Sequence, residues 1–287
     1  MDFRNGRESR NVEDRRGQGG RGLGGGGKIG IGTIVLALVA MYFGIDPSVV
    51  LDNAAVLQSP SGIQPGAERP AAENELASFS AKVLTETEQT WGAIFRASGQ
   101  QYREPTLVLF TGATRSACGV GQAQMGPFYC PADGKLYLDV SFFDELSRRF
   151  GAPGDFAQAY VIAHEVGHHV QNLLGISGKV QQARQRASER EGNQLSVRLE
   201  LQADCLAGVW AHHAVRQQQI ILREGDVEEA LRAATAIGDD HIQKQTQGYA
   251  VPDSFTHGSA AQRVRWFRTG LERGNFSECD TFSASAL

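Results

Sequence analysis

The feature that most restricts the fold of this chain is a pair of histidines that bracket a glutamate in an otherwise apolar stretch. The motif H-E-x-x-H occupies positions 164–168 and lies inside residues 156–174, where apolar spacing predicts a helix. Residues i and i+4 lie one above the other on a helix face, so His164 and His168 can bind one zinc ion together. Burying such polar side chains without partners is costly, which favours a metal site.

The glutamate of the motif is placed for proton transfer. Glu165 lies about 100° around the helix from His164, beside the predicted metal. Zinc lowers the pKa of a bound water, and Glu165 could accept its proton. The alternative is coincidence, but the chain has only seven histidines, and a random pair rarely brackets a glutamate in this way. His169 points off the ligand face, so we expect it to be structural or to support a ligand.

A catalytic zinc site needs a third protein ligand and an open position for water. Glu200 is the best candidate, because it shares a small, apolar helix face with Asp204 in a second predicted helix, residues 193–213. Asp204 could accept the free ring N–H of a ligating histidine and fix its tautomer. The alternative is a solvent-exposed Glu200. Glu189 and Glu191 are poorer candidates, because they lie in a charged stretch rich in glutamine.

An uncharged apolar run extends over residues 29–45. Its length is at the lower end of what crosses a bilayer as a helix, about 17–25 residues, so we predict one transmembrane helix here. Tyr42 and Phe43 lie near its end, where interfacial aromatic residues are common. A buried core helix is disfavoured by the polar flanks. A cleaved signal peptide is disfavoured by the long leader and the lack of a clear A-x-A site.

Charge on the two sides of this run predicts its orientation. Seven basic residues precede it, and no Lys or Arg follows before Arg69. The positive-inside rule then places residues 1–28 in the cytoplasm. These residues are rich in Gly and Arg, and this composition predicts a disordered segment. The remaining chain would lie outside the cytoplasmic (inner) membrane, in the periplasm, as a single-pass protein in a compartment where disulfides can form.

Composition divides the rest of the chain into a linker and one domain. Residues 46–70 are rich in Pro, Gly and Ser, which is typical of a linker. We expect one folded domain over residues 71–287, with a helix near 73–97, strands at 106–110 and 135–140, and helices thereafter. This order predicts an α+β fold, mostly helical with a small sheet. The net charge of −4 gives no reason to expect a nucleic-acid partner.

The residues around the two histidines resemble a known family. Positions 161–171 (Val-Ile-Ala-His-Glu-Val-Gly-His-His-Val-Gln) and 200–204 (Glu-Leu-Gln-Ala-Asp) resemble the bacterial neutral zinc metallopeptidases of the YpfJ type. The resemblance covers most of the chain, including the predicted anchor. More distantly, the layout is similar to that of Ste24/HtpX-like gluzincins, whose third ligand is the Glu of a later E-x-x-x-D helix. It implies a zincin-like domain in which Glu200 ligates zinc and Asp204 orients a ligand histidine.

The same resemblance implies roles for two further segments. Residues 128–138 are similar to the edge strand that pairs with an extended substrate in such peptidases. Residues 256–263 are similar to a C-terminal T-H-P-x-x-x-x-R element, with Gly258 in place of Pro. His257 would then stabilise the oxyanion of the tetrahedral intermediate. The alternative for His257 is an ordinary residue before a C-terminal helix. Arg263 is expected to be structural rather than catalytic.

Four cysteines allow three disulfide pairings, and the sequence does not decide between them. We favour Cys118 with Cys130, which would stiffen the cleft entrance. The second bridge would then join Cys205 to Cys279 and tie the tail to the metal site. A cysteine metal ligand is less favoured, because two histidines and a glutamate already complete a catalytic set.

Together these patterns predict a membrane-anchored metallopeptidase with one zinc ion per chain. It would hydrolyse peptide bonds in peptide or protein substrates of the cell envelope, with Glu165 as general base. Two alternatives stay open. One is a catalytically silent, zinc-stabilised module that binds envelope proteins, against which an intact Glu165 argues. The other is a zinc amidase that acts on cell-wall peptides.

Overall fold

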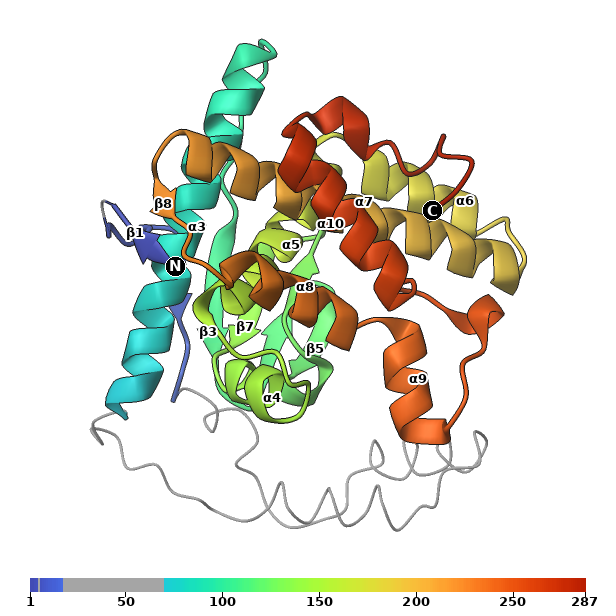
Figure 1. The fold of residues 1–287 in the computed structure, drawn as a ribbon, viewed down its shortest axis with the longest axis horizontal. Coiled ribbons are helices and arrows are strands. Elements are labelled where there is room, and N and C mark those ends of the chain that lie inside the picture. Colours follow the sequence, from blue (N-terminus) through green and yellow to red (C-terminus); the bar gives the residue numbers. More distant parts are fainter. Residues whose placement is uncertain (5, 18–69) are drawn as a thin grey trace. The chain divides into compact units, whose positions relative to one another are not determined.

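The computed structural model describes residues 1–4, 6–17 and 70–287. In this part of the chain helices outweigh strands, and the predicted α+β class is confirmed (Figure 1). The predicted transmembrane helix, residues 29–45, lies outside the described residues, as does the predicted linker apart from Pro70.

A four-stranded sheet provides the framework on one side of the fold. Its order is β2-β3-β7-β6, with β2, β3 and β7 parallel and β6 antiparallel to β7. β3 and β7 are almost fully buried, as expected for the inner strands of a parallel sheet, and both were predicted. The strands are β2 (Val12–Asp14), β3 (Thr106–Phe110), β6 (Phe128–Cys130) and β7 (Lys135–Asp139).

Two small ribbons complete the strands of the described residues. β1 (Asp2–Phe3) pairs antiparallel with β8 (Ile220–Ile221). β4 (Ala113–Ser116) and β5 (Gly119–Gln122) form a hairpin between β3 and β6 in the sequence. The sheet therefore ends at β6 on one side and at β2 on the other.

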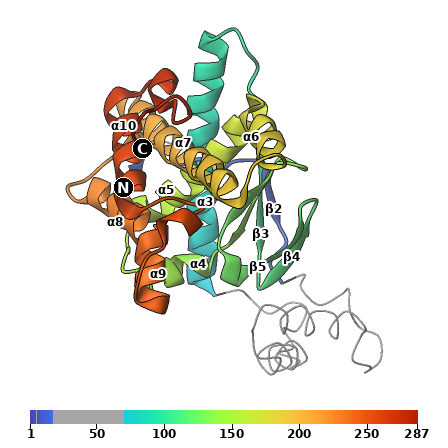
Figure 2. The same cartoon turned by 90° about the vertical axis from the view of Figure 1, so that its right-hand side faces the viewer.

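The helices surround α5, which carries the two motif histidines. α5 packs against α3, α7 and α8 and contacts β6 and β7, so it lies between the sheet and the helical layer (Figure 2). Its apolar positions lie in the main core together with those of α7. The helices are α3 (Ala71–Ala97), α4 (Phe142–Arg148), α5 (Asp155–Leu173), α6 (Ile176–Arg184), α7 (Glu189–Arg216), α8 (Asp226–Ala236), α9 (Asp239–Gln247) and α10 (Ala260–Arg273).

The predicted helices are present with shifted ends. α7 begins four residues earlier than the predicted 193–213, because Ser188 and Glu191 form a reciprocal capping box at its start. α10 begins in the same way, with a capping box between Ser259 and Gln262. The described residues also contain three short 3-10 turns: η1 (Ala123–Met125), η2 (Pro252–Ser254) and, after α10, η3 (Phe276–Cys279).

Two glycines let α7 and α10 approach unusually closely. A Cβ atom at Gly270 would overlap the backbone carbonyl of Cys205, and one at Gly208 would overlap that of Phe267. Residues with a side chain at these positions would separate the helices. The close approach brings Arg263 of α10 against the face of α7 that carries Asp204.

The N-terminal segment belongs to the fold, so the prediction that residues 1–28 are disordered is wrong for its described part. β2 pairs in parallel with β3, and β1 pairs with β8. Met1 and Arg16 are only 6% and 5% exposed. The segment has few large apolar residues of its own, but it is stabilised by strands more than ninety residues away in the sequence. Residues 18–28 lie outside the described residues.

The same pairing corrects the predicted topology and localisation. Residues before the 29–45 run share one sheet with residues after it, so both lie on the same side of any membrane. A single-pass protein with its N-terminus in the cytoplasm and its domain in the periplasm is therefore wrong. No helix in the described part of the chain combines the length and apolar character needed to cross a bilayer. The predicted membrane partner and periplasmic compartment both depend on that topology, so neither is supported.

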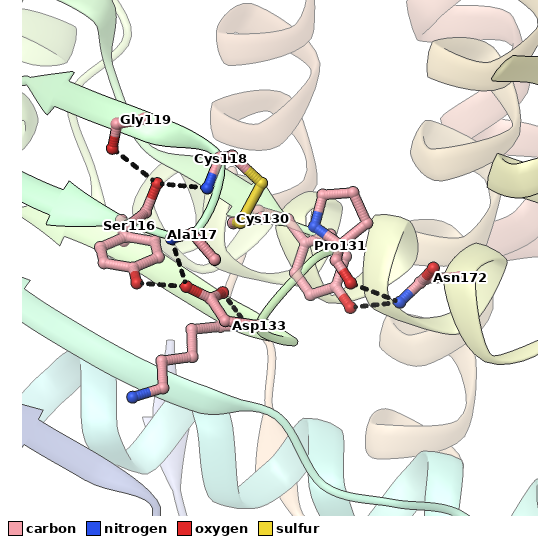
Figure 3. The surroundings of a disulfide bond; sticks show 11 residues. Ser116, Ala117, Cys118, Gly119, Cys130, Pro131, Asp133 and Asn172 are labelled. Atoms are coloured by element: carbon pink, nitrogen blue, oxygen red, sulfur yellow. Dashed lines mark hydrogen bonds between the residues drawn. A yellow bond between two sulfur atoms is a disulfide. The ribbon is translucent and has the colours of Figure 1, made fainter.

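Both favoured disulfides are present. Cys118 is bonded to Cys130, and Cys205 to Cys279. Around the first bridge, the carboxylate of Asp133 accepts hydrogen bonds from the backbone N–H of Ala117 and the hydroxyl of Tyr137 (Figure 3). The bridge thus joins the β4–β5 hairpin to the edge strand β6, as predicted from the position of the two cysteines.

Glu86 of α3 predicts a pH-dependent stability. Its side chain is 1% exposed, and burial raises its pKa to about 7 from an ordinary 4.5. The folded state therefore holds the proton more tightly, and stability falls as the pH rises from 4.5 to about 7. We expect Glu86→Gln to raise the free energy of unfolding by about 1–2 kcal/mol at pH 8 and to change it little at pH 4. Urea unfolding at both pH values measures this, and an equal effect at the two would contradict it.

Candidate metal centre

Three side chains converge where α5 crosses α7. His164 and His168 project from α5 one turn apart, and Glu200 projects from α7. One ligand atom from each lies within 4.8 Å of the other two. The Nε2 atom of His164 is 3.2 Å from one Glu200 oxygen, and that of His168 is 3.4 Å from the other. Ligands of a tetrahedral zinc ion at ordinary bond lengths lie roughly 3.4 Å apart, so the spacing fits that ion.

The chemistry of the three donors also fits zinc. Two imidazole nitrogens and a carboxylate are a common catalytic set, and three ligands leave one position open. Burial acts to raise the pKa of Glu200, but the two histidines outweigh it and hold that pKa well below its usual range. Burial acts to lower the pKa of His164, while Asp204 and Glu200 raise it to about 10. A metal must displace that proton, so its binding strengthens as the pH rises.

Asp204 holds the other nitrogen of His164. One of its oxygens lies 2.9 Å from His164 Nδ1 and accepts a hydrogen bond of 2.5 Å from the Tyr160 hydroxyl. Arg263 donates to both Asp204 oxygens, at 2.9 and 3.0 Å. The side chains of Asp204 and Arg263 are 0% and 2% exposed. Burial acts to raise the pKa of Asp204, but Arg263 and His164 keep it below its usual value. Asp204 therefore stays ionised and turns Nε2 of His164 toward Glu200.

Gln171 holds the other nitrogen of His168. Its side-chain oxygen lies 2.9 Å from His168 Nδ1, and its amide nitrogen donates to the Leu199 carbonyl. Gln171 is one turn beyond His168 on α5, so this contact is local, and the side chain is fully buried. Each of the two histidines is thus held at Nδ1 and directs Nε2 to the shared carboxylate.

The glycine inside the motif controls the approach of the two helices. A Cβ atom at Gly167 would lie 2.9 Å from the backbone oxygen of Ala203 and 3.1 Å from its Cα. We therefore expect Gly167→Ala to push α5 from α7, lower the free energy of unfolding by about 1–3 kcal/mol and weaken zinc binding. Gly178→Ala in α6 is the matched control, because a Cβ there meets nothing within 4 Å. Chemical unfolding and zinc titration of both variants test this, and equal behaviour would contradict it.

Glu165 lies beside the candidate ligands and is partly exposed. Burial raises the pKa of its carboxyl above the usual range. Among the described residues, its carboxylate has no hydrogen bond or ion pair. Unlike Glu200 and Asp204, it is therefore free to accept a proton from a bound molecule.

The structure places His257 on the segment between α9 and α10. Its Nδ1 lies 3.1 Å from an Asp239 oxygen, and the other Asp239 oxygen accepts backbone N–H groups of Thr256, His257 and Gly258. The hydrogen bond to Asp239 raises the pKa of His257, and the charge of Glu200 contributes to this rise. The ring is 55% exposed, so its Nε2 side is accessible. Asp239 was not foreseen, because it lies eighteen residues away in the sequence.

His169 is structural, as expected from its direction on the helix. It is 2% exposed, its Nε2 donates to the Arg103 carbonyl at 2.6 Å, and its Nδ1 accepts from the Tyr129 hydroxyl. Burial lowers the pKa of His169 to about 4, so the ring is neutral. Asn172 donates to the same hydroxyl. Two residues one turn apart on α5, the helix that carries the two motif histidines, therefore hold edge strand β6 through Tyr129.

Sequence comparison with known proteins finds relatives of this chain. A family model described as "Putative neutral zinc metallopeptidase" matches residues 1–282. The chain belongs to this family. It is 51% identical over 294 residues to the Escherichia coli (strain K12) protein named "Uncharacterized protein YpfJ", covering 99% of this chain and all of that protein. It is 41% identical over 259 residues to Mb2605 of Mycobacterium bovis and to Rv2575 of Mycobacterium tuberculosis, covering 86% of each chain. No solved structure matches this chain.

Membership in the neutral zinc metallopeptidase family confirms the predicted resemblance and implies zinc as the metal. The match begins at residue 1, in agreement with the N-terminal strands that the fold incorporates. The more distant similarity to Ste24/HtpX-like gluzincins is untested and stays a prediction.

Proposed function

We propose that this chain is a zinc-dependent peptidase that hydrolyses peptide bonds, with one zinc ion held by His164, His168 and Glu200. The observation that carries the proposal is the convergence of two Nε2 atoms on one carboxylate, with each Nδ1 held from behind. A zincin-like active site needs such a set of three protein ligands and an open fourth position. When bound, zinc would supply a Lewis acid and an acidified water.

Glu165 is the proposed general base. Its carboxylate is unpaired within the described residues, and its raised pKa strengthens it as a proton acceptor. It can take a proton from the attacking water and pass it to the departing amine. Glu200 and Asp204 cannot serve, because their oxygens are engaged by His164, His168 and Arg263.

His257 is the proposed stabiliser of the oxyanion that forms during hydrolysis. Asp239 fixes the ring through Nδ1 and leaves Nε2 free to donate a hydrogen bond. The raised pKa of His257 favours the charged form, which suits a group that must stabilise negative charge. Its exposure is compatible with contact to a substrate that approaches from solvent.

The substrate is proposed to be an extended peptide that adds to edge strand β6. This strand ends the sheet and is anchored to α5 through Tyr129, His169 and Asn172. An edge strand offers unpaired backbone groups that pair with any extended chain, so main-chain hydrogen bonds would hold the scissile bond near the metal. A peptide or an unfolded protein segment suits this edge.

Cleavage of an unfolded, fluorescently labelled protein by the purified full chain tests the proposal. We expect cleavage that is lost with a zinc chelator, restored by added zinc and absent in His168→Ala. Cleavage by zinc-free protein, or equal cleavage by His168→Ala, would overturn it. A zinc-loaded chain that cleaves no unfolded protein or peptide would instead favour the binding module.

A further inference from the structure

A line of buried hydrogen bonds runs from the C-terminal segment to a candidate metal ligand. The backbone carbonyl of Cys279 accepts from the Gln202 amide nitrogen at 2.9 Å. The Gln202 side-chain oxygen accepts from the Gln171 amide nitrogen at 3.1 Å. The Gln171 oxygen then meets His168 Nδ1 at 2.9 Å. Gln171 and Gln202 are 0% and 4% exposed, so water cannot readily replace these contacts.

The Cys279 carbonyl determines which group donates and which accepts in every hydrogen bond of this line. A backbone carbonyl can only accept, so Gln202 must turn its NH₂ group toward Cys279. Its oxygen then faces Gln171, which must in turn donate. The Leu199 carbonyl, 2.7 Å from the same Gln171 nitrogen, demands the same orientation. The Gln171 oxygen is left facing His168, whose Nδ1 must therefore carry the proton.

A neutral imidazole has one protonated nitrogen and one free lone pair. A proton fixed on Nδ1 leaves the lone pair on Nε2, the atom that faces Glu200. His164 reaches the same state through Asp204, an ionised carboxylate that can only accept. The two histidines thus use different devices: a charged partner for one, and a neutral relay from the backbone for the other.

The carbonyl that starts the relay is held by covalent and polar contacts. Cys279 forms a disulfide with Cys205 of α7, and both cysteines are fully buried. Cys205 lies five residues beyond Glu200 on that helix. Arg198 of α7 donates to backbone carbonyls of Thr281 and Ala284, and the Thr281 hydroxyl donates back to the Arg198 carbonyl. The segment from Asn275 onward therefore has a fixed position on the helix that supplies the third ligand.

We propose that the C-terminal segment, held by the Cys205–Cys279 disulfide, positions His168 for metal binding through Gln202 and Gln171. The inference rests on the proposed function in one respect, that His168 is a zinc ligand. It adds two positioning residues and makes zinc affinity depend on a disulfide that contacts no metal. Partners of this kind typically change metal affinity by about 10–100-fold when they are removed.

The test measures the zinc dissociation constant of the full chain by competition with a chromophoric chelator. We expect Gln171→Leu to weaken zinc binding by about 10–100-fold, as the direct partner of His168. Gln202→Leu and the double variant Cys205→Ser/Cys279→Ser should weaken it by about tenfold, because the Leu199 carbonyl still orients Gln171. The matched control is Cys118→Ser/Cys130→Ser, which removes the other disulfide and should keep the affinity of the wild type.

The thermal midpoint of each zinc-free variant separates positioning from mere stability. A lowered midpoint with an unchanged zinc dissociation constant in all three variants would overturn the inference and leave the proposed function intact. Equal weakening by the two disulfide variants would also overturn it. A wild-type chain that binds no zinc would instead remove the proposed function on which the inference rests.

Discussion

Replacing Glu165 with glutamine is expected to lower kcat for peptide hydrolysis by about 10²–10⁴-fold while zinc remains bound. Glutamine keeps the shape of the side chain but cannot accept a proton from water. Because Glu165 does not belong to the three converging ligands, zinc content and affinity should stay within a few-fold of the wild type. Initial rates at saturating substrate, together with zinc titration of the same preparation, measure both effects.

The control for this substitution is Glu224→Gln, the same chemical change at an exposed position. It should leave rate and zinc affinity unchanged. A Glu165→Gln protein that retains the wild-type rate would show that another group accepts the proton. A protein that loses zinc would show that Glu165 holds the metal.

Removing the positively charged side chain of Arg263, which holds Asp204, should cause the largest loss of stability among these variants. Arg263→Met would remove the partner that donates to both oxygens of the buried Asp204 carboxylate, and only His164 would remain as a charged neighbour. Both side chains of the lost pair are almost fully inaccessible. Breaking one side of a buried ion pair costs about 3–5 kcal/mol when the remaining charge is uncompensated. His164 offsets part of the Asp204 charge, so the lower end of that range, about 3 kcal/mol, applies here. We expect a loss of that size in the free energy of unfolding of the zinc-free protein, measured in urea.

Two further variants separate this cause from lost packing. Arg268→Met, an exposed position on the same helix, should change stability by no more than about 0.5 kcal/mol. Adding Asp204→Asn to Arg263→Met removes the carboxylate that has lost Arg263 and should recover part of the loss. A double variant as unstable as Arg263→Met alone would assign the loss to packing rather than to the buried charge.

The local part of the candidate site follows from helix periodicity. His164 and His168 are one turn apart on α5, and Glu200 and Asp204 one turn apart on α7, so the sequence alone places each pair on one face. The apolar surroundings of both pairs predict that the faces meet. The structure brings these four residues together at the crossing of α5 and α7.

The contacts that escaped prediction are long-range. Asp239, at the start of α9, contacts His257 in the segment that follows that helix. Gln202 links Gln171 to the backbone carbonyl of Cys279 near the C-terminus. Neither has a periodic signature, because each depends on how separate elements pack. The N-terminal strand β2 was not predicted for the same reason. Its composition is typical of an unfolded segment, and its strand structure depends on pairing with the distant strand β3.

The central claim is that His164, His168 and Glu200 bind one zinc ion, and zinc content per chain tests it most directly. The purified full chain with both disulfides formed should hold about one zinc ion per molecule. The His164→Ala variant should retain its fold by circular dichroism and hold essentially no zinc. A well-folded wild-type chain that takes up no zinc when the metal is supplied, or a His164→Ala variant that binds it as tightly, would contradict the account.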